Sequence, residues 1–135
     1  MPNVTRYNAN DCTILVDGVY ITGLGEDMIS WEKEEGYFEA IVGAQGDVIK
    51  SEINNDIHNM TVTVQPTSPE FGYLIELKNR KEPFPVWCVN KEMGIRVGGT
   101  KANVMEAPSI ELGAQAADCE FVFCVFDGVT EATKQ

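Results

Sequence analysis

Short stretches in which apolar and polar residues alternate, separated by turn residues, dominate the chain. In the clearest of them, Met60, Val62 and Val64 share one side, because successive side chains of a strand point to opposite faces. The pattern predicts strands at residues 12–16, 19–22, 60–65, 84–91, 94–97, 100–105 and 119–126. So many short strands indicate a mainly β protein, an antiparallel β-sandwich or partial barrel.

Glycine-containing dipeptides predict where the strands turn. Asp17-Gly18 suits the positive φ angles of a type I′ turn and should join the first two strands into a tight hairpin. Gly98-Gly99 is expected to turn the chain between two later strands. Residues 1–10 and residues 129–135 are expected to be loose ends.

Residues 69–80 are the one stretch with helical spacing. Ser68 offers an N-cap, and a first-turn proline and an acidic residue follow it. We expect a peripheral helix that packs one side on the sheets through Phe71, Leu74 and Ile75. Its polar side then presents the basic residues Lys78, Arg80 and Lys81.

A second hairpin is predicted around Glu35-Gly36, in a register that places Glu32 opposite Glu39. One face then collects the apolar residues Ile29, Trp31, Phe38, Ala40 and Val42. The other face carries the acidic residues Glu32, Glu34 and Glu39. Like charges directly opposite cost up to about 1 kcal/mol. Either this face is an ordinary solvated surface, or the register differs by a residue, or acid serves a purpose other than stability.

Residues 43–59 form a polar, glycine-containing stretch that is too long for an ordinary hairpin loop. Segments of this kind in compact domains are often functional or dock against a partner. We therefore expect this stretch to contact another subunit, through Gly43, Gly46, Asp47, Lys50, Ser51, Asn54, Asn55 and Asp56.

The composition is that of one globular domain over residues 1–135, with 44% apolar and 23% charged residues. The net charge of −11 disfavours nucleic acid as a bound ligand, since phosphate binding needs cations. The charge is uneven: residues 7–49 are strongly acidic, whereas residues 78–101 are mostly basic. This asymmetry indicates either two solvated faces or complementary patches for head-to-tail self-association.

Catalytic and metal-binding motifs are missing from the sequence. The cysteines Cys12, Cys88, Cys119 and Cys124 form no C-x-x-C pair, and we expect buried, reduced thiols, with Cys119 and Cys124 on opposite strand faces. His58 is interpreted as an exposed loop residue without a catalytic partner. We expect no enzyme activity, no cofactor and no metal. No apolar run approaches the roughly 20 residues of a membrane span, and the first residues do not resemble a secretory signal.

An ordered series of motifs runs through residues 43–77. It comprises a G-x-x-G turn, a polar segment, an alternating Thr/Val strand, and a Gln-x-Thr-Ser sequence before the helix. The residues concerned are Gly43, Gly46, Ser51, Asn54, Thr61, Gln65, Thr67 and Ser68. In this order the series resembles the tail tube proteins of contractile-tailed bacteriophages. The segments at residues 18–23, 26–32, 94–104 and 120–127 are similar to the same family.

The resemblance implies a structural subunit of which six copies form a ring. Rings would stack into a hollow, β-barrel-lined tube inside a contractile sheath, in the tail of a virion assembled in a bacterial cytoplasm. The implied partners are further copies, the sheath, the tape-measure protein, and the baseplate and tail-terminator proteins. DNA would pass without specific binding along a lumen lined by Glu32, Glu34 and Glu39, since a negative wall repels phosphates. The basic end of the helix would face sheath or neighbours.

Two alternatives remain open on the sequence. The first is a carbohydrate- or peptide-binding β-sandwich module, for which Trp31, Trp87 and Tyr37 would supply an exposed aromatic platform. The second is the tube protein of a related secretion system, which would share the same general architecture.

Overall fold

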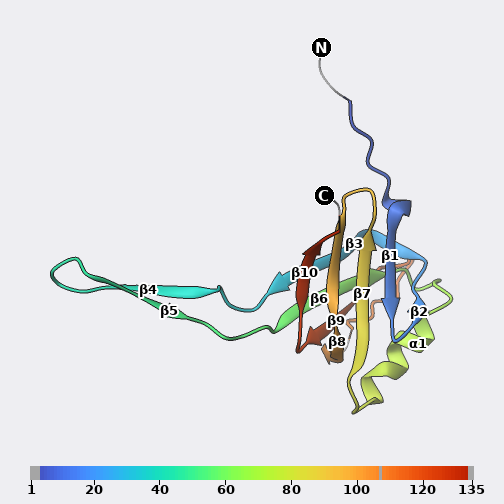
Figure 1. Cartoon of the computed structure of the whole chain (residues 1–135). Helices are drawn as coiled ribbons and strands as arrows, with labels where there is room; N and C mark the ends of the chain where they lie inside the picture. Colours follow the sequence, from blue (N-terminus) through green and yellow to red (C-terminus); the bar gives the residue numbers. More distant parts are fainter. Residues whose placement is uncertain (1–3, 107, 134–135) are drawn as a thin grey trace.

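The computed structural model describes residues 4–106 and 108–133, which form a β-rich body and a long hairpin that projects from it (Figure 1). The described elements, in chain order, are η1 Ala9–Asp11, β1 Cys12–Val16, β2 Val19–Tyr20, β3 Leu24–Lys33, β4 Phe38–Val42, β5 Val48–Glu52, β6 His58–Val64, α1 Phe71–Glu76, η2 Leu77–Asn79, β7 Phe84–Asn90, β8 Ile95–Glu106, β9 Cys119–Val125 and β10 Val129–Ala132. This mainly antiparallel β fold with one peripheral α-helix confirms the predicted fold class, and its sheets do not close into a barrel.

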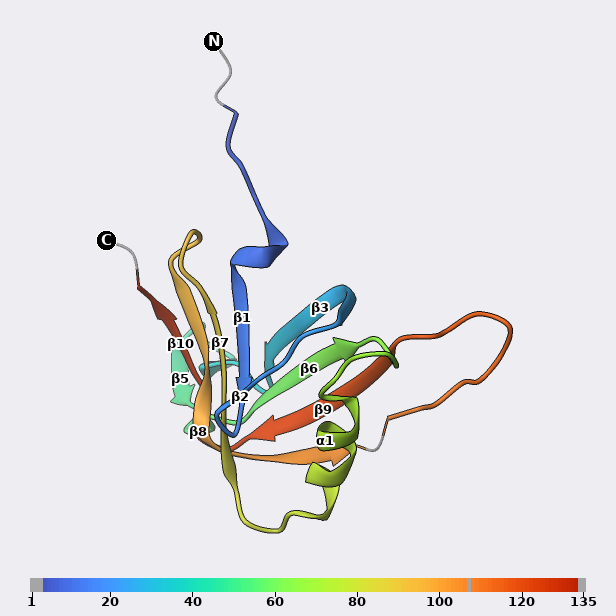
Figure 2. The same cartoon turned by 90° about the vertical axis from the view of Figure 1, so that its right-hand side faces the viewer.

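Eight strands form one bent antiparallel sheet. Its order is β2-β1-β7-β8-β9-β6-β3, with β10 paired to β8. The first half of β8 pairs with β7 and β10, and its second half pairs with β9. The sheet therefore folds over along β8 into two layers, one containing β1, β7 and β10 and the other containing β9, β6 and β3 (Figure 2).

The bend lies at the glycine pair of β8. The predicted turn there is wrong, because β8 runs without interruption from Ile95 to Glu106. Gly98 has φ +142°, and a Cβ added to it would lie 2.1 Å from the carbonyl oxygen of Val86. The two glycines thus allow a close approach of the neighbouring strand and a change of strand direction, instead of reversing the chain.

The core lies between the two layers, and α1 covers its open end. Met60, Val62 and Val64 are all fully buried, which confirms the predicted inner face of that strand. The ring of Phe71, on α1, meets Phe121 edge-on with 5.9 Å between centroids. The predicted packing side of the helix is confirmed, since Leu74 is fully buried and Phe71 and Ile75 pack against the core.

Both ends of the helix differ in detail from the prediction. Ser68 does not directly precede the first helical turn, because Glu70 is the cap residue and α1 begins at Phe71. The Ser68 hydroxyl instead donates to the carbonyl of Thr22 at 2.6 Å and accepts the N–H of Glu70 at 3.3 Å. The α-helix ends at Glu76, and the 3₁₀ turn η2 continues it. Among the described residues, no helix is long and apolar enough to cross a membrane.

The first hairpin is confirmed, with Val16 opposite Val19 and positive φ at both Asp17 (51°) and Gly18 (80°). The prediction of a loose end from residue 129 is wrong for β10, which pairs with residues 95–98 of β8. Without β10, this edge of β8 would leave its backbone N–H and C=O groups unpaired, and β10 supplies their hydrogen-bond partners. Residues 1–3 and 134–135, also predicted to be loose, lie outside the described residues.

The second predicted hairpin does not form. β3 pairs with β6, so that Glu32 lies opposite Asn59, and β4 pairs with β5, so that Glu39 lies opposite Ser51. Glu32 and Glu39 therefore do not face each other, and the predicted apolar face divides between the body and the projecting hairpin. The predicted turn at Glu35-Gly36 does not form, because β3 pairs instead with β6, whose inner side carries the fully buried residues Met60, Val62 and Val64. This long-range pairing buries more apolar surface than a local hairpin would.

Candidate assembly surfaces

The projecting hairpin, which we call the arm, consists of β4, β5 and the turn between them (Figure 1). Its turn is closed by hydrogen bonds from Gly43 N–H to the Asp47 carbonyl (2.8 Å) and from Gly46 N–H to the Gly43 carbonyl (3.0 Å). The predicted contact stretch thus contains a strand: Gly43, Gly46 and Asp47 form the tip, Lys50 and Ser51 lie on β5, and Asn54, Asn55 and Asp56 lie near the base.

The arm has no core of its own. Every residue of β4 and β5 is exposed, including large apolar side chains on both faces. The exposed apolar side chains of the arm strands are Phe38, Ile41, Val42, Val48 and Ile49. A lone two-stranded hairpin is marginally stable in water, and exposed apolar patches often mark interaction sites. The arm is therefore a candidate interaction surface.

Backbone and side-chain hydrogen bonds hold the base of the arm to the body. The Glu34 N–H donates to the Ile57 carbonyl at 3.0 Å, and the Gly128 N–H donates to the Asp56 carbonyl at 3.0 Å. The Asn55 side-chain amide donates to the Glu35 carboxylate at 3.0 Å. Two of the predicted contact residues, Asn55 and Asp56, thus fix the position of the arm.

His58 adds a buried contact at the same base. It is 5% exposed, so the interpretation as an exposed loop residue is wrong. Its ring stacks on Trp31 at 4.5 Å between centroids, and its Nδ1 lies 2.8 Å from the Asp56 carbonyl oxygen. The indole N–H of Trp31 donates to the Thr130 hydroxyl at 2.8 Å, which joins β3 to β10 across the two layers.

A second surface, the outer polar face, covers the outside of β3, β6 and β9. Register places Glu32, Asn59 and Cys124 in one row across these strands. The neighbouring row consists of Ser30, Thr61 and Val122. Burial raises the pKa of the Cys124 thiol, and the nearby charge of Glu34 raises it further. Glu32 therefore lies on this face and Glu34 lies near it, whereas Glu39 lies on β4 of the arm.

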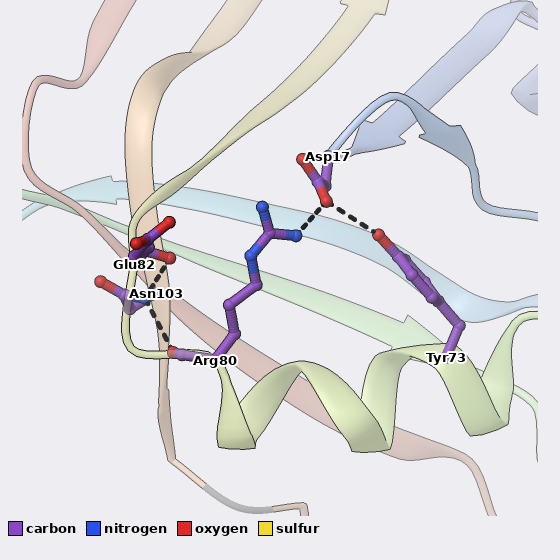
Figure 3. A network of polar contacts seen from close by, with 5 residues as sticks. All are labelled: Asp17, Tyr73, Arg80, Glu82 and Asn103. Atoms are coloured by element: carbon purple, nitrogen blue, oxygen red, sulfur yellow. Dashed lines mark hydrogen bonds and ion pairs between the residues drawn. The ribbon is translucent and has the colours of Figure 1, made fainter.

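The basic end of the helix is a third surface. Lys78, Arg80 and Lys81 are all exposed. The Arg80 guanidinium forms an ion pair with Asp17, whose carboxylate also accepts the Tyr73 hydroxyl at 3.2 Å (Figure 3). Burial raises the pKa of Tyr73, and the Asp17 charge adds to this effect. Arg80 thus fastens the helix to the first hairpin, while no ion pair holds the two lysines in the described part of the chain.

The side-chain amide of Asn103 holds the segment between η2 and β7 in place. The Asn103 side chain donates to the carbonyls of Arg80 and Glu82, each at 3.3 Å (Figure 3). The side chain of Arg80 also lies 5.5 Å from the centre of the Phe84 ring. These contacts fix the path from η2 into β7, and with it the position of the basic residues.

All four cysteines are free thiols. Cys119 is buried on the core side of β9 and Cys124 lies on its outer side, as the strand alternation predicted. Burial raises the pKa of Cys88 to about 11, so that thiol is protonated at neutral pH. Over the residues that the structure describes, no group of three His, Cys, Asp or Glu side chains could hold a metal ion.

The three aromatic residues of the alternative binding module are each engaged within the molecule. Trp31 stacks on His58, and the Trp87 ring is covered by the Arg96 guanidinium at 3.8 Å. Tyr37 is 74% exposed but lies near the base of the arm, with the Lys33 ammonium 4.8 Å from its ring centre. The geometry therefore does not favour a shared aromatic platform.

No family model matches the sequence, and no curated protein matches it. Several chains of solved structures share its fold over nearly the full length. A chain of the tube-terminating cap of the anti-feeding prophage superposes with a TM-score of 0.66 at 11% identity, covering 98% of this chain and 96% of its own.

Two further similar chains come from the extracellular contractile injection system PVC. One is from its sheath/tube terminator in the extended state, with a TM-score of 0.56, 14% identity, and coverage of 96% of this chain and 99% of its own. The other is from its sheath–tube complex in the extended state, with a TM-score of 0.57, 14% identity, and coverage of 94% and 92%. At these identities the likeness establishes a common fold.

Proposed function

We propose that this protein is a structural subunit of the tube of a contractile tail-like assembly. The observation that carries the proposal is the arm, a hairpin exposed on both faces that can bury its apolar side chains only on another molecule. The shared fold with chains of tube-containing injection systems supports it. The proposed activity is mechanical and needs no reaction chemistry.

In this proposal six copies form a ring and the rings stack into a tube. Five residues of strand extend the arm by about 17 Å, enough to reach a neighbouring subunit. Ile41 and Ile49 lie opposite each other on one face of the arm, and Val42 and Val48 do so on the other. Each face can therefore pack on a different part of a neighbour, within one ring or between rings.

We assign the outer polar face to the wall of the tube. Its two rows present hydroxyl and amide groups, the carboxylate of Glu32, the thiol of Cys124 and the apolar side chain of Val122, and Glu34 lies nearby. Such a wall repels phosphates and supplies no cations for counterion release, so DNA would pass without binding. Glu39, which the sequence placed in the lumen, belongs to the arm in this assignment.

The remaining partners follow from the same arrangement. The sheath, or a neighbouring subunit, would contact the basic end of the helix at Lys78 and Lys81, which lies on a different part of the body from the outer polar face. The tape-measure protein would occupy the tube, and the baseplate and terminator proteins would close its two ends. In a bacteriophage the assembly is the tail of a virion, and in a secretion system it is a free or cell-bound injector.

A second candidate is a terminator, which caps a tube instead of building it. It is favoured by the likeness to the tube-terminating cap of the anti-feeding prophage, at a TM-score of 0.66. A tube subunit must stack on both ends of its ring, whereas a terminator stacks on one. The two functions therefore differ in what the purified protein forms.

Negative-stain electron microscopy of the purified protein over a range of concentrations tests the proposal. Open-ended tubes of stacked rings are the expected result for a tube subunit, and single rings that never stack would identify a terminator. A monodisperse monomer at every concentration would contradict both functions. A monomer that also retains a soluble glycan or peptide would instead support the binding module.

A further inference from the structure

The arm leaves the body and returns to it beside β10, the last strand of the described chain (Figure 1). The chain passes from β3 into the arm after Lys33 and enters β6 at His58 on its return. All residues of β10 are exposed, and β8 is the strand with which β10 pairs. Besides this pairing, β10 and the turn before it contact the base of the arm.

A closed circuit of contacts, which we call the clamp, joins Trp31, Asp56, His58, Gly128 and Thr130. The indole N–H of Trp31 donates to the Thr130 hydroxyl at 2.8 Å, and its ring stacks on that of His58 with 12° between the planes. His58 Nδ1 and the Gly128 N–H lie 2.8 Å and 3.0 Å from one acceptor, the Asp56 carbonyl oxygen. The backbone from Gly128 to Thr130 closes the circuit.

Close packing leaves the clamp little freedom to move. His58 is buried, and a Cβ added to Gly128 would lie 2.2 Å from its Nδ1, so only glycine fits over the ring. Because a carbonyl oxygen only accepts hydrogen bonds, Nδ1 carries a proton and donates it to the Asp56 carbonyl. A buried polar group that moved away would lose its partner, which is unfavourable. The clamp therefore favours one geometry.

The clamp ties both chain segments at the base of the arm to the same C-terminal segment. Trp31 lies on the strand that leads into the arm, and Asp56 lies on the segment that leads out of it. The Glu34 N–H also donates to the Ile57 carbonyl at 3.0 Å, which holds the two segments to each other. A hairpin whose two ends are each held to the body cannot swing freely about its base.

We infer that the clamp sets the direction of the arm before assembly, with Trp31 and Thr130 as positioning residues. The inference rests on the proposed function, in which the arm packs on a second copy. A freely moving arm would lose conformational entropy on docking, whereas an arm already held in its bound direction loses less. The clamp therefore lowers the protein concentration that assembly needs.

Two substitutions remove one hydrogen bond of the clamp. Trp31→Phe keeps an aromatic ring that can stack but lacks the N–H, and Thr130→Val lacks the acceptor. Each should raise the concentration needed for half-maximal assembly by about threefold or more, because one hydrogen bond is lost. The double variant should do no more than the stronger single variant, since both changes remove the same bond. Sedimentation velocity over a concentration series measures the assembly.

Spin labels measure the direction of the arm itself. Gln45→Cys near the tip of the arm and Lys91→Cys on the body place labels at two exposed positions. The half-buried thiols Cys12 and Cys124 are replaced by serine, so that they take up no label. Double electron–electron resonance of the dilute monomer should give one narrow distance distribution. Each of the two clamp variants should broaden it.

Matched controls keep the bond or make the same change elsewhere. Thr130→Ser retains a hydroxyl acceptor and should behave like the unchanged protein in both measurements. Thr133→Val repeats the Thr130→Val change at an exposed threonine whose hydroxyl forms no hydrogen bond within the described residues, and it should have no effect. Thermal unfolding followed by circular dichroism shows whether each variant is folded.

The outcomes separate the clamp from the proposed function. Clamp variants that only melt at a lower temperature, with a narrow distribution and normal assembly, would make these contacts part of fold stability and overturn the inference, while the tube function stands. Broadened distributions with normal assembly, or a broad distribution in the unchanged protein, would overturn it as well. If the unchanged protein never assembles, the tube function fails, and the distance distributions still decide whether the clamp sets the direction of the arm.

Discussion

At the scale of single residues, Gly98 shows how a fold depends on the absence of a side chain. Its φ of +142° is unfavourable for any other residue, and an added Cβ would lie 2.1 Å from the Val86 carbonyl oxygen. We expect Gly98→Ala to lower the free energy of unfolding by at least about 2 kcal/mol, measured by urea denaturation.

The control is Gly113→Ala, at a position without positive φ and with open space around the added Cβ. It should change the free energy of unfolding by less than about 0.5 kcal/mol. Equal stabilities of the two variants would show that β8 can bend without its glycine, and would remove the reason given for the two-layer arrangement.

Asp127 links stability to pH. Desolvation tends to raise the pKa of its carboxyl, but donors from Thr100 and Lys101 outweigh this effect and hold the pKa below 3.8. The Lys101 N–H lies 3.0 Å from the carboxylate. Because the pKa is depressed in the folded state, the stabilisation is complete above the unfolded pKa and is lost as pH falls through the folded pKa.

Asp127→Asn should therefore cost about 1–2 kcal/mol of unfolding free energy at pH 7, where the charged acceptor is lost. The difference between the two proteins should shrink as the pH is lowered from 5 through 3.8 and below, followed by thermal unfolding in a pH series. A difference that does not change with pH would mean that the charge of Asp127 has no part in holding the β9–β10 turn.

At the scale of elements, α1 is short, and Leu74 is its one fully buried residue. Leu74 is fully buried, whereas Gly72, two residues earlier, has open space around it. Leu74→Asp should destabilise the protein by more than about 3 kcal/mol, because a charge replaces a core side chain. Gly72→Asp introduces the same residue on the exposed side and should be nearly neutral. Similar melting temperatures for both variants would contradict the packing of α1.

The arm can be removed at a defined place. Tyr37 and Ile53 lie side by side at its base, where the Ile53 N–H donates to the Tyr37 carbonyl at 2.9 Å. Replacing residues 38–52 with a short Gly-Ser linker should leave a folded body and abolish assembly, because the arm contributes no core residue. Circular dichroism and sedimentation velocity measure the two effects.

A milder variant tests the same contribution of the arm to assembly. Ile41→Ser with Ile49→Ser removes apolar surface from one face of the arm and keeps the hairpin length. It should weaken assembly without preventing it, since burial contributes about 25 cal/mol per Å² of apolar surface. Normal tubes from the arm deletion would refute the role proposed for the arm.

At the scale of the whole molecule, the outer polar face should set how the tube treats DNA. Glu32→Lys with Glu34→Lys places cations on the wall in every subunit, so the tubes should bind double-stranded DNA at low salt and release it as salt rises. DNA held inside a tube should resist nuclease digestion. Glu76→Lys with Glu82→Lys, at exposed positions on and after the helix, is the matched control. Binding that leaves the DNA fully open to nuclease would place Glu32 and Glu34 on the outside.

Local pattern was sufficient for several elements. The Asp17-Gly18 hairpin, the alternation of Met60, Val62 and Val64, and the packing side of the helix all follow from neighbouring residues. Each depends on turn chemistry or on a period of side-chain burial, which are properties of a short stretch of chain. The sequence also predicted that the polar stretch at residues 43–59 contacts another subunit, which stays a prediction; in the structure this stretch divides between the arm, its base and the start of β6.

Other features depend on residues distant in the sequence. Glu35-Gly36 resembles a hairpin turn, yet β3 pairs with β6, because this pairing buries more apolar surface than a local hairpin would. Gly98-Gly99 resembles a turn as well, and only the packing against Val86 makes it a bend inside one strand. His58 sits in a polar run and is buried all the same, because Trp31 and Gly128 close over it from other strands.

The candidate surfaces divide in the same way. The sequence by itself determined the acidic balance, the basic helix end and the alternation that separates Glu32 from the core, because charge and strand period belong to the chain. Only the tertiary structure decided that Glu39 lies on the arm, apart from Glu32 and Glu34, and that Arg80 pairs with Asp17. It also decided that four acidic residues of β8, β9 and residues 108–118 line one hollow. Strand pairing over long separations brings these groups together or apart, and the free energy that selects the pairing is summed over the whole core.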